Sequence, residues 1–394
     1  MNDLLASVDA SRLTADRRYL HAHAETGFDL PETFAYVWQR LTDMGLAPRK
    51  CGQCGIVADI GRGEKAVLLR ADMDALAICE EAAVPFACKS GSMHACGHDL
   101  HTAMLLEAAR ILKAREDALH GTVRLMFQPA EEPLLGAADM LADGLLEEIE
   151  PIAAFMIHVL TGLEIPVGTV IVSAPGVSAP AAGMFEVRIQ GKGCHGAMPH
   201  TGVDPITAAA HTVLNLQQIQ ARELSIAQPC ALTIGMLQSG DAANVIPDRA
   251  VLRGSYRAFE DDTGEYLRRR IGEIAGQTAA MFRASAETEM LGSCPTLLND
   301  EGLSHAILAA LRELLGQEKA LLSSELGGGA AKMSGSEDFA NITHRAPSLM
   351  VALAAGRPQE GYAHPAHHPQ TMFDESALPV GAAVYACMAL TALG

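Results

Sequence analysis

The chain has 394 residues and a formal net charge of −18 at pH 7, because 47 Asp and Glu outnumber 29 Lys and Arg. This acidic excess argues against a nucleic-acid partner, since binding to phosphates requires a basic surface. A chain of this length usually folds around more than one hydrophobic core, so we expect two domains. The 9 cysteines lack regular spacing and no charged-then-apolar leader precedes Ser11, which predicts a cytoplasmic location.

The first part of the chain, to about residue 180, alternates short apolar runs with helical stretches. Three of these runs predict strands, each leading into polar residues: 66–70, 122–127 and 152–157. Residues 100–115 have the apolar spacing of a helix. This alternation is typical of an α/β domain with a mainly parallel sheet, whose ligands gather outside the carboxyl ends of the strands.

A second domain is predicted after residues 175–180, where Ser, Ala, Pro and Gly accumulate. Three strand-like runs (184–189, 230–237, 250–259) and two helical stretches (204–221, 263–284) follow. Two helices against an antiparallel sheet make a small α+β domain. Features of the larger domain resume after about Pro295, so we predict that residues 181–293 are inserted into a domain formed by residues 1–180 plus 294–394.

The end of the chain could be mistaken for a membrane span. Residues 377–394 carry no charged side chain over a length approaching that of a span. The segment is rich in Ala and Gly, contains Pro379, and lacks flanking Lys, Arg or Trp anchors. We therefore predict a helix buried in a large soluble core, and no membrane span.

Side chains that bind metals occur on separate segments of the chain. Cys96 and His98 share one short loop, and Glu132 follows the predicted strand at 122–127. His158 ends another apolar run, and His367 lies near the end of the chain. A hydrolytic metal site needs such donors from separate segments and an open position for water. Five ligands with one bridging carboxylate would serve two ions, and this mixture of sulfur, nitrogen and oxygen suits zinc, manganese or cobalt.

Each of these residues also has a structural interpretation. A lone cysteine such as Cys96 is usually a buried packing residue, and His158 could be a hydrogen-bonded core histidine. Glu131 and Glu132 could be a solvated pair at the start of a helix. Their grouping favours the metal interpretation. Adjacent residues at a strand end point to opposite sides, so we expect Glu132 to bind metal while Glu131 stays off it as the general acid and base.

Several motifs, taken in order, extend this interpretation over nearly the whole chain. They are Arg18–His21, Arg70–Leu76, Met93–His101, Phe127–Glu132, His158, Gly191–His200, Asn244–Pro247, Gly335–Phe339 and His367–Pro369. In this order they make the chain resemble the di-metal aminoacylase and carboxypeptidase family, which includes hippurate hydrolases and indole-acetyl-amino-acid hydrolases. The resemblance implies two divalent ions bound by the five donors, with Glu131 as the general base. Asp72 and Asp74 would orient the ligands by hydrogen bonds.

The same resemblance implies that the inserted domain acts as a lid and mediates dimerisation, so that we expect a homodimer or larger homo-oligomer. His195 would stabilise the developing oxyanion, in its own chain or in a partner's active site. Asn244 and Arg257 would bind the substrate carboxylate, which the planar guanidinium matches geometrically. Their structural alternatives are an Asn244 that caps a turn and an Arg257 that pairs with an acidic neighbour.

These features predict a metal-dependent amidohydrolase that cleaves N-acyl or N-aroyl amino acids to a carboxylic acid and an amino acid. Two divalent ions would activate water, and Glu131 would move the proton. A dipeptidase or carboxypeptidase is the nearest alternative, since the same groups accept a peptide carbonyl. A non-catalytic metal-binding protein is a second alternative, against which the presence of Glu131 argues.

Overall fold

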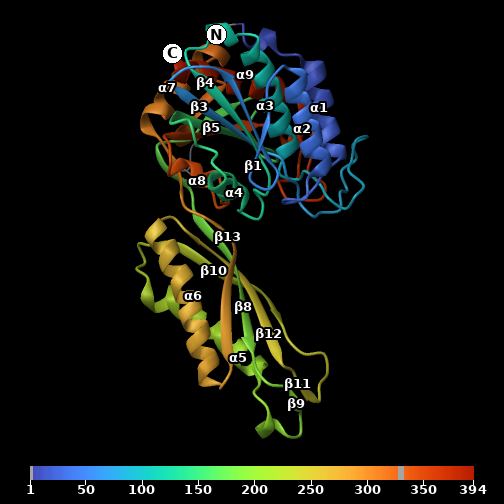
Figure 1. Ribbon diagram of the computed structural model, residues 1–394, viewed down its shortest axis with the longest axis vertical. Coiled ribbons are helices and arrows are strands. Elements are labelled where there is room, and N and C mark those ends of the chain that lie inside the picture. The colour runs from blue at the N-terminus through green and yellow to red at the C-terminus, as the bar shows by residue number, and fades with distance from the viewer. Residues whose placement is uncertain (1–2, 327–331) are drawn as a thin grey trace. The chain divides into compact units, whose positions relative to one another are not determined.

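The computed structural model describes residues 3–326 and 332–394, which divide into two compact units (Figure 1). Unit 2 consists of Ala179–Leu297 with Lys332–Glu337, and the other described residues form unit 1. The predicted boundaries at 180/181 and 293/294 differ from these by two and four residues. Thr296 belongs to unit 2 because its backbone N–H and its hydroxyl both donate hydrogen bonds to Asp261, at 2.7 and 2.9 Å.

Unit 1 is built on an eight-stranded mixed sheet in the order β1-β2-β4-β3-β5-β16-β6-β15. The neighbours β4, β3, β5 and β16 run parallel, as do β6 and β15, whereas β1, β2 and β4 pair antiparallel, as do β16 and β6. The predicted strands at 66–70, 122–127 and 152–157 are confirmed as β3, β4 and β5. The strand bounds are β1 Arg49–Cys51, β2 Gly55–Gly61, β3 Ala66–Asp72, β4 Thr122–Gln128, β5 Pro151–Leu160, β6 Val170–Val172, β15 Ala320–Leu322 and β16 Ser348–Ala354, with β7 Gly176–Ala179 and β14 Leu297–Asn299 in a separate pair.

Most helices of unit 1 contact this sheet, whereas the first, α1, packs mainly on α3 and α9. The helix bounds are α1 Ala10–Ala22, α2 Pro31–Asp43, α3 His98–Lys113, α4 Gly136–Ala142, α7 Glu301–Leu315, α8 Ala340–Thr343 and α9 Leu378–Leu393. Helices α3 and α9 lie side by side and contact β3 and β5 at the centre of the sheet (Figure 1). Strand β3 is buried along its whole length and begins with the apolar run Ala66–Leu69, as central strands of a covered sheet do, before the buried Arg70 and Asp72.

Helix α9 is long and apolar enough to cross a membrane by composition alone, but it packs inside unit 1. Within the helical stretch Glu375–Leu393, 67% of the most apolar 18-residue window is buried inside the protein. Tyr385 anchors it, since its hydroxyl donates to the carbonyl of Arg70 at 2.7 Å and accepts from the N–H of Ile157 at 3.2 Å. A buried polar group of this kind fits a core helix.

Unit 2 is an α+β sandwich of one antiparallel sheet and two helices. Its sheet has the order β10-β12-β8-β13, and α5 and α6 contact each other and the sheet. The bounds are β8 Ala181–Gln190, β10 Cys230–Gln238, β12 Arg249–Ala258, β13 Ser285–Cys294, α5 Pro205–Gln218 and α6 Asp261–Met281, with a short ribbon of β9 Cys194–His195 and β11 Val245–Ile246. The prediction missed β13, whose alternating Glu, Thr and Met residues carry no run of apolar side chains.

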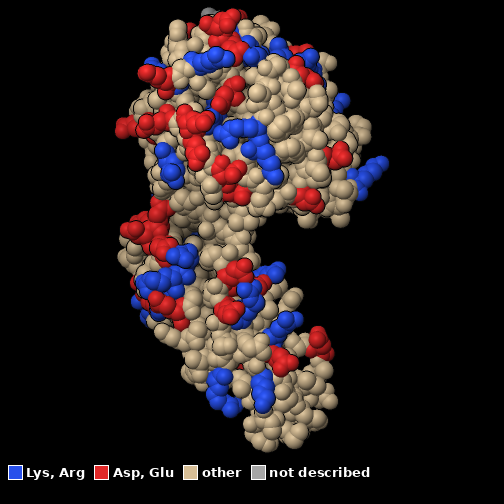
Figure 2. All heavy atoms as spheres, viewed as in Figure 1, with Lys and Arg blue, Asp and Glu red and all other residues tan. Residues whose placement is uncertain are grey.

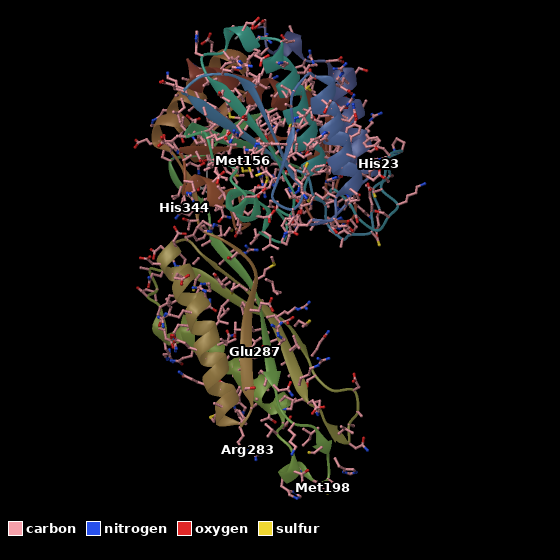
Figure 3. The ribbon with its side chains drawn as sticks, in the orientation of Figure 1. His23, Met156, Met198, Arg283, Glu287 and His344 are labelled. Atoms are coloured by element: carbon pink, nitrogen blue, oxygen red, sulfur yellow. The ribbon has the colours of Figure 1, made fainter. Side chains whose placement is uncertain are left out.

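The surface of unit 2 carries many paired charges. Along α6, Arg269 pairs with Glu273, and Arg270 pairs with both Glu273 and Glu223. Figure 2 shows basic and acidic side chains intermixed over this helix. Figure 3 contrasts buried Met156 of unit 1 with Met198, which is exposed near the ribbon of unit 2. The intermixed charge offers no uniformly basic stripe on α6 of the kind that nucleic-acid binding requires.

Candidate metal centre

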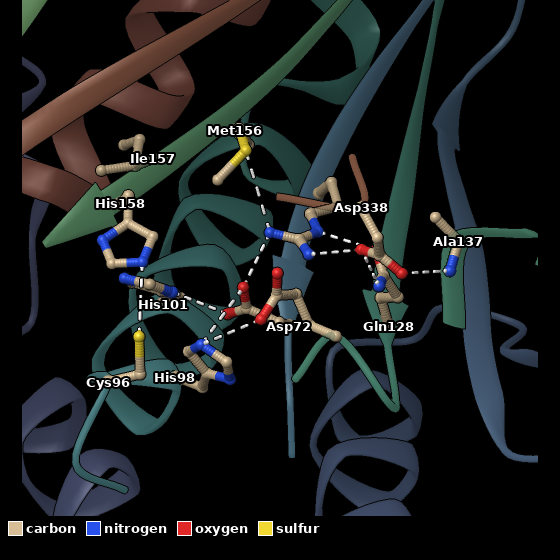
Figure 4. A network of polar contacts seen from close by, with 12 residues as sticks. Asp72, Cys96, His98, His101, Gln128, Ala137, Met156, Ile157, His158 and Asp338 are labelled. Atoms are coloured by element: carbon tan, nitrogen blue, oxygen red, sulfur yellow. Dashed lines mark hydrogen bonds and ion pairs between the residues drawn. The ribbon is translucent and has the colours of Figure 1, made fainter. Parts of the chain in front are cut away.

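The candidate centre lies in unit 1, where β3, β4 and β5 reach their carboxyl ends (Figure 4). Asp72 is the last residue of β3 and lies opposite Gln128, the last residue of β4. His158 lies inside β5, two residues before its end, and not after the strand as predicted. This edge of the sheet collects polar residues that lie at or near the ends of the three central strands, in agreement with the rule for open α/β sheets.

The loop that carries Cys96 and His98 leads directly into α3. Gly97 has φ +86° and precedes the first helical residue, His98. A Cβ at Gly97 would come within 2.3 Å of a Val159 methyl group, so both the backbone angle and the close approach of β5 require glycine. This glycine places the thiol of Cys96, at the end of the loop, two residues before the imidazole of His98, at the start of α3.

Asp74 holds His98 and the Glu131–Glu132 turn together. The Nδ1 of His98 donates to the carbonyl of Asp74 at 2.8 Å. The Asp74 carboxylate accepts from the backbone N–H groups of Glu131 and Glu132, at 3.0 and 3.3 Å. Because Nδ1 of His98 is used as a donor, Nε2 is the nitrogen that would offer its lone pair to a metal once the ring is neutral.

The prediction that Glu131 and Glu132 point to opposite sides of a strand end is wrong. Strand β4 stops at Gln128, and the two glutamates lie in a turn entered through Ala130, whose φ is +51°. Carboxylate oxygens of Glu131 and Glu132 lie 4.0 and 3.9 Å from Nε2 of His98. Alternation therefore does not apply, and both carboxylates face the same region.

Two further histidines complete the cluster. The Nε2 of His158 lies 3.5 Å from the sulfur of Cys96, and its Nδ1 interacts with the carbonyl of Val159 at 2.8 Å. The Nε2 of His367 lies 3.7 Å from a carboxylate oxygen of Glu132. The backbone of His367 adopts φ +66° and donates its N–H to the carbonyl of Ala95 at 3.0 Å, which ties this loop to the Cys96 loop.

The five predicted ligands fall into two groups. Cys96, His98 and His158 form one, and Cys96, Glu132 and His367 form the other, with the donor atoms of each group within 4.8 Å of one another. Cys96 belongs to both, whereas the sequence led us to expect a bridging carboxylate. The other histidines of the last loop, His364 and His368, stack on each other with their ring centroids 4.2 Å apart.

The electrostatics of this cluster favour the ionised thiol. Burial opposes ionisation of Cys96, but the positive charges of His158 and His98 outweigh it and hold its pKa well below the ordinary value. Burial and the nearby charge of Cys96 raise the pKa of Glu132 to about 8. Such mutual repulsion between a thiolate and a carboxylate is what a cation bound between them relieves.

The donors also meet the steric and bonding requirements of a metal site. Nε2 of His98 and Oε1 of Glu132 are buried and make no hydrogen bond within residues 3–326 and 332–394. Buried polar atoms are normally satisfied, so two such atoms facing one cluster indicate a missing partner. Thiolate, imidazole and carboxylate together suit a divalent ion such as zinc. The residues present therefore fit a metal centre.

A buried ion network supports the metal-binding loop from the side of α1. Asp99, the residue after His98, accepts hydrogen bonds from Arg17 Nε and His21 Nδ1, both at 2.8 Å. The other ring nitrogen of His21 lies 3.0 Å from a carboxylate oxygen of Glu80. Burial opposes the charge of His21, but Asp99 and Glu80 outweigh burial and raise its pKa to about 9. His21 is thus held between two carboxylates as the charged imidazolium.

This network predicts a pH-dependent stability. The pKa of His21 rises from 6.5 in the unfolded chain to about 9 in the folded protein, so its contribution is fully present below pH 6.5 and lost as the pH rises through 9. His21→Gln should therefore lower the free energy of unfolding by roughly 3 kcal/mol more at pH 6 than at pH 10, measured by urea unfolding. His305→Gln on the exposed side of α7 is the control, and it should lower the free energy of unfolding by less than about 0.5 kcal/mol at either pH. Equal losses for His21→Gln at both pH values would contradict the charged-pair assignment.

The remaining predicted site residues belong to unit 2. His195 pairs with Val245 across the β9–β11 ribbon, next to Asn244, and Nδ1 of His195 accepts from the N–H of Ala197 at 3.0 Å. Arg257 lies on β12, where its guanidinium donates to the hydroxyl of Ser336 at 2.6 Å. His195 and Asn244 are both exposed. The partner of Arg257 in this hydrogen bond is therefore a hydroxyl group, and not the acidic neighbour of the structural alternative.

Sequence reasoning assigned no role to three buried residues that connect the site. Arg70 donates to Asp72 at 2.7 Å and to Gln128 at 2.9 Å, and it lies 3.3 Å from Asp338 (Figure 4). His101 lies 2.6 Å from Asp72. Asp338 also accepts from the N–H of Ala137 at 2.9 Å. The signal for His101 was its position three residues after His98, on the same face of α3; Arg70 and Asp338 lie in the motifs Arg70–Leu76 and Gly335–Phe339.

The fold and this cluster define a metal-dependent amidohydrolase. Residues 68–391 match the model of the peptidase family M20/M25/M40. The chain is 38% identical over 381 residues to IAA-amino acid hydrolase ILR1-like 2 from Arabidopsis thaliana, covering 95% of this chain and 83% of that protein. It is 36% identical to N-acetyl-L-cysteine deacetylase from Bacillus subtilis, covering 96% and 87%. A dinuclear metal binding peptidase of the M20 family from Bacillus subtilis superposes with a TM-score of 0.73 at 31% identity over 97% of each chain.

The chain therefore belongs to the peptidase family M20/M25/M40. This membership confirms the family resemblance, the α/β fold class and the assignment as a metal-dependent amidohydrolase that the sequence predicted.

Proposed function

We propose that this protein hydrolyses the amide bond of N-acyl or N-aroyl amino acids, hippurate-like conjugates included, and releases a carboxylic acid and an amino acid. The observation that carries the proposal is that the five predicted ligands form two donor groups sharing Cys96. Relatives similar over nearly the whole chain are a hydrolase of IAA-amino acids and a deacetylase of N-acetyl-L-cysteine, which share an acylated amino acid as substrate.

Two divalent ions, zinc, manganese or cobalt, would be held by these groups, one by Cys96, His98 and His158 and the other by Cys96, Glu132 and His367. When bound, they polarise the scissile carbonyl and lower the pKa of water. Cys96 is the donor proposed to be shared, in place of a carboxylate.

The residues of the chain would do the remaining work. Glu131 would take a proton from the attacking water and deliver it to the leaving amine. Its position supports this role, since a hydrogen bond to Asp74 fixes its turn beside the donor cluster. His195 donates a hydrogen bond to the developing oxyanion, in its own chain or in a partner copy. Arg257 and Asn244 bind the carboxylate of the amino acid, which would select acylated amino acids over simple amides. Asp72 and Asp74 orient the ligands.

Unit 2, close to the predicted inserted domain of residues 181–293, would serve as a lid and as the contact between copies in a homodimer or larger oligomer. The domain of residues 1–180 plus 294–394 would carry the catalytic groups. We propose a cytoplasmic location, in keeping with nine cysteines without regular spacing.

A substrate panel tests this function. The metal-loaded protein is assayed for released amino acid on N-acetyl, N-benzoyl and indole-acetyl amino acids, against dipeptides of the same amino acids. We expect kcat/KM for the best acylated amino acid to exceed that for the matched dipeptide at least about tenfold, the effect of 1.4 kcal/mol in transition-state binding. A preference for dipeptides would assign the chain as a dipeptidase, and the absence of turnover on every substrate would favour a non-catalytic metal-binding protein.

A further inference from the structure

One buried histidine, His101, contacts both sides of the donor cluster through different atoms. It lies in the first turn of α3 and is fully buried. Its Nδ1 lies 2.6 Å from Oδ1 of Asp72, and its Nε2 accepts a hydrogen bond from the backbone N–H of Val159 at 2.9 Å. Because Nε2 accepts, the ring is neutral and Nδ1 carries the proton that it donates to Asp72. Both ring nitrogens are therefore occupied within the fold.

His101 joins the Asp72 carboxylate to the backbone of Val159, and both residues lie beyond the last backbone pair between β3 and β5. Backbone pairing between β3 and β5 ends at Arg70 and Met156. Asp72 and His158 both lie two residues beyond this last pair, and Val159 follows His158. The buried N–H of Val159 would cost roughly 1–3 kcal/mol if it were left without an acceptor. His101 supplies that acceptor and so replaces the missing ladder contact between the two strand ends.

His101 also packs against both donor imidazoles of one metal group. Its ring centroid lies 5.4 Å from that of His98 and 4.9 Å from that of His158. On the far side, Asp72 is held by Arg70, and Arg70 lies 3.3 Å from Asp338 (Figure 4). The network therefore leaves Asp72 little freedom to move relative to the donors.

We infer that His101 is a positioning residue that fixes the His98 and His158 donors by bridging Asp72 and the end of β5. This inference rests on the proposed function, because those two imidazoles are proposed ligands. Asp72, His98 and His101 also have ring nitrogens and a carboxylate oxygen close enough to hold an ion among themselves. That alternative requires His101 to give up one of its two hydrogen bonds, so we assign it no ligand role.

Three variants of the full-length protein separate the effects of the two hydrogen bonds that His101 makes, one with Asp72 and one with Val159. His101→Asn keeps a donor near the position of Nδ1 and loses the acceptor for Val159. His101→Gln keeps an acceptor near the position of Nε2 and loses the donor to Asp72. His101→Ala loses both. Thr212→Val is the matched control, because it removes a buried hydrogen bond from a threonine hydroxyl to a backbone carbonyl, that of Ala208 at 2.9 Å, on α5 and outside the donor cluster.

Co²⁺ alone is titrated into the metal-free proteins, and binding is followed by visible absorption, which reports the coordination of the ion independently of turnover. We expect the wild type and Thr212→Val to take up two equivalents with affinities within about threefold of each other. His101→Asn and His101→Gln should still take up two equivalents, with at least one dissociation constant raised about 10–100-fold and an altered spectrum, as for other groups that orient ligands. His101→Ala should show the largest effect.

Two results would overturn the inference. Wild-type affinity and spectrum in both His101→Asn and His101→Gln would show that the bridge does not position the donors. Saturation of these variants at one equivalent would make His101 a ligand. His101→Asn retains the donor to Asp72, so it keeps the test valid if His101→Ala does not fold. A wild type that binds no metal would instead refute the proposed function, which separates the two failures.

Discussion

Replacing Glu131 with Gln is expected to lower kcat for acylated amino acids about 10²–10⁴-fold, the usual contribution of a general acid or base. The introduced amide keeps the shape of the side chain and cannot take up the proton. The backbone N–H at this position still donates to Asp74, so the turn beside the cluster should persist. Steady-state kinetics measures kcat, and elemental analysis of the same preparation measures its metal content.

The control for this variant is Glu164→Gln, an exposed carboxylate of unit 1 that interacts with Gln359. It should change kcat less than about twofold, since surface substitutions away from the site have small effects. Unchanged turnover in Glu131→Gln would remove Glu131 from the proton-transfer role. Loss of metal along with turnover would show instead that Glu131 is a ligand.

Cys96→Ala is expected to abolish tight binding of both ions, since the Cys96 sulfur belongs to both donor groups. The loss in affinity should exceed the 10–100-fold known for partners outside the coordination sphere, so a dissociation constant raised at least about 100-fold is predicted. Turnover should fall with metal occupancy and return only partly at high metal concentration. Metal titration of the variant, monitored by isothermal calorimetry, measures this loss.

Cys387→Ala is the matched control. This cysteine is buried in α9 and takes no part in either donor group. Its removal leaves a small cavity, which lowers stability without touching the ligands. If Cys96→Ala binds both ions as tightly as Cys387→Ala, the thiolate is not a shared ligand.

The sequence predicted the centre of the fold well because its signals there are local. Strands β3, β4 and β5 are short apolar runs that lead into polar residues, and such runs identify buried parallel strands without any knowledge of their partners. The strand β13 was missed because its apolar residues face α6 only in alternation with charged ones. Its role depends on pairing with β8, a contact between residues about 100 positions apart.

The sequence also predicted which residues would gather at the candidate site, since Cys96, His98, Glu131 and Glu132 lie in distinctive surroundings and come together in the structure. It did not predict the direction of each side chain. The turn that carries Glu131 depends on the positive φ of Ala130 and on two hydrogen bonds to Asp74, 57 and 58 residues away. A period-two rule cannot anticipate such a turn, so the predicted opposition of Glu131 and Glu132 failed.

The connections behind the ligands were the least predictable part of the site. Arg70 approaches Asp338 across a separation of 268 residues, and His101 receives its hydrogen bond from a backbone N–H in β5. A buried arginine or histidine next to a metal motif looks the same in sequence whether it binds, positions or only packs. Only the geometry of both ring nitrogens of His101 distinguishes these cases.

Anomalous diffraction from crystals of the zinc-loaded protein, recorded at the zinc absorption edge, tests the central claim most directly. We expect two peaks in unit 1, one contacted by Cys96, His98 and His158 and the other by Cys96, Glu132 and His367. A single peak, or peaks that Cys96 does not touch, would contradict it.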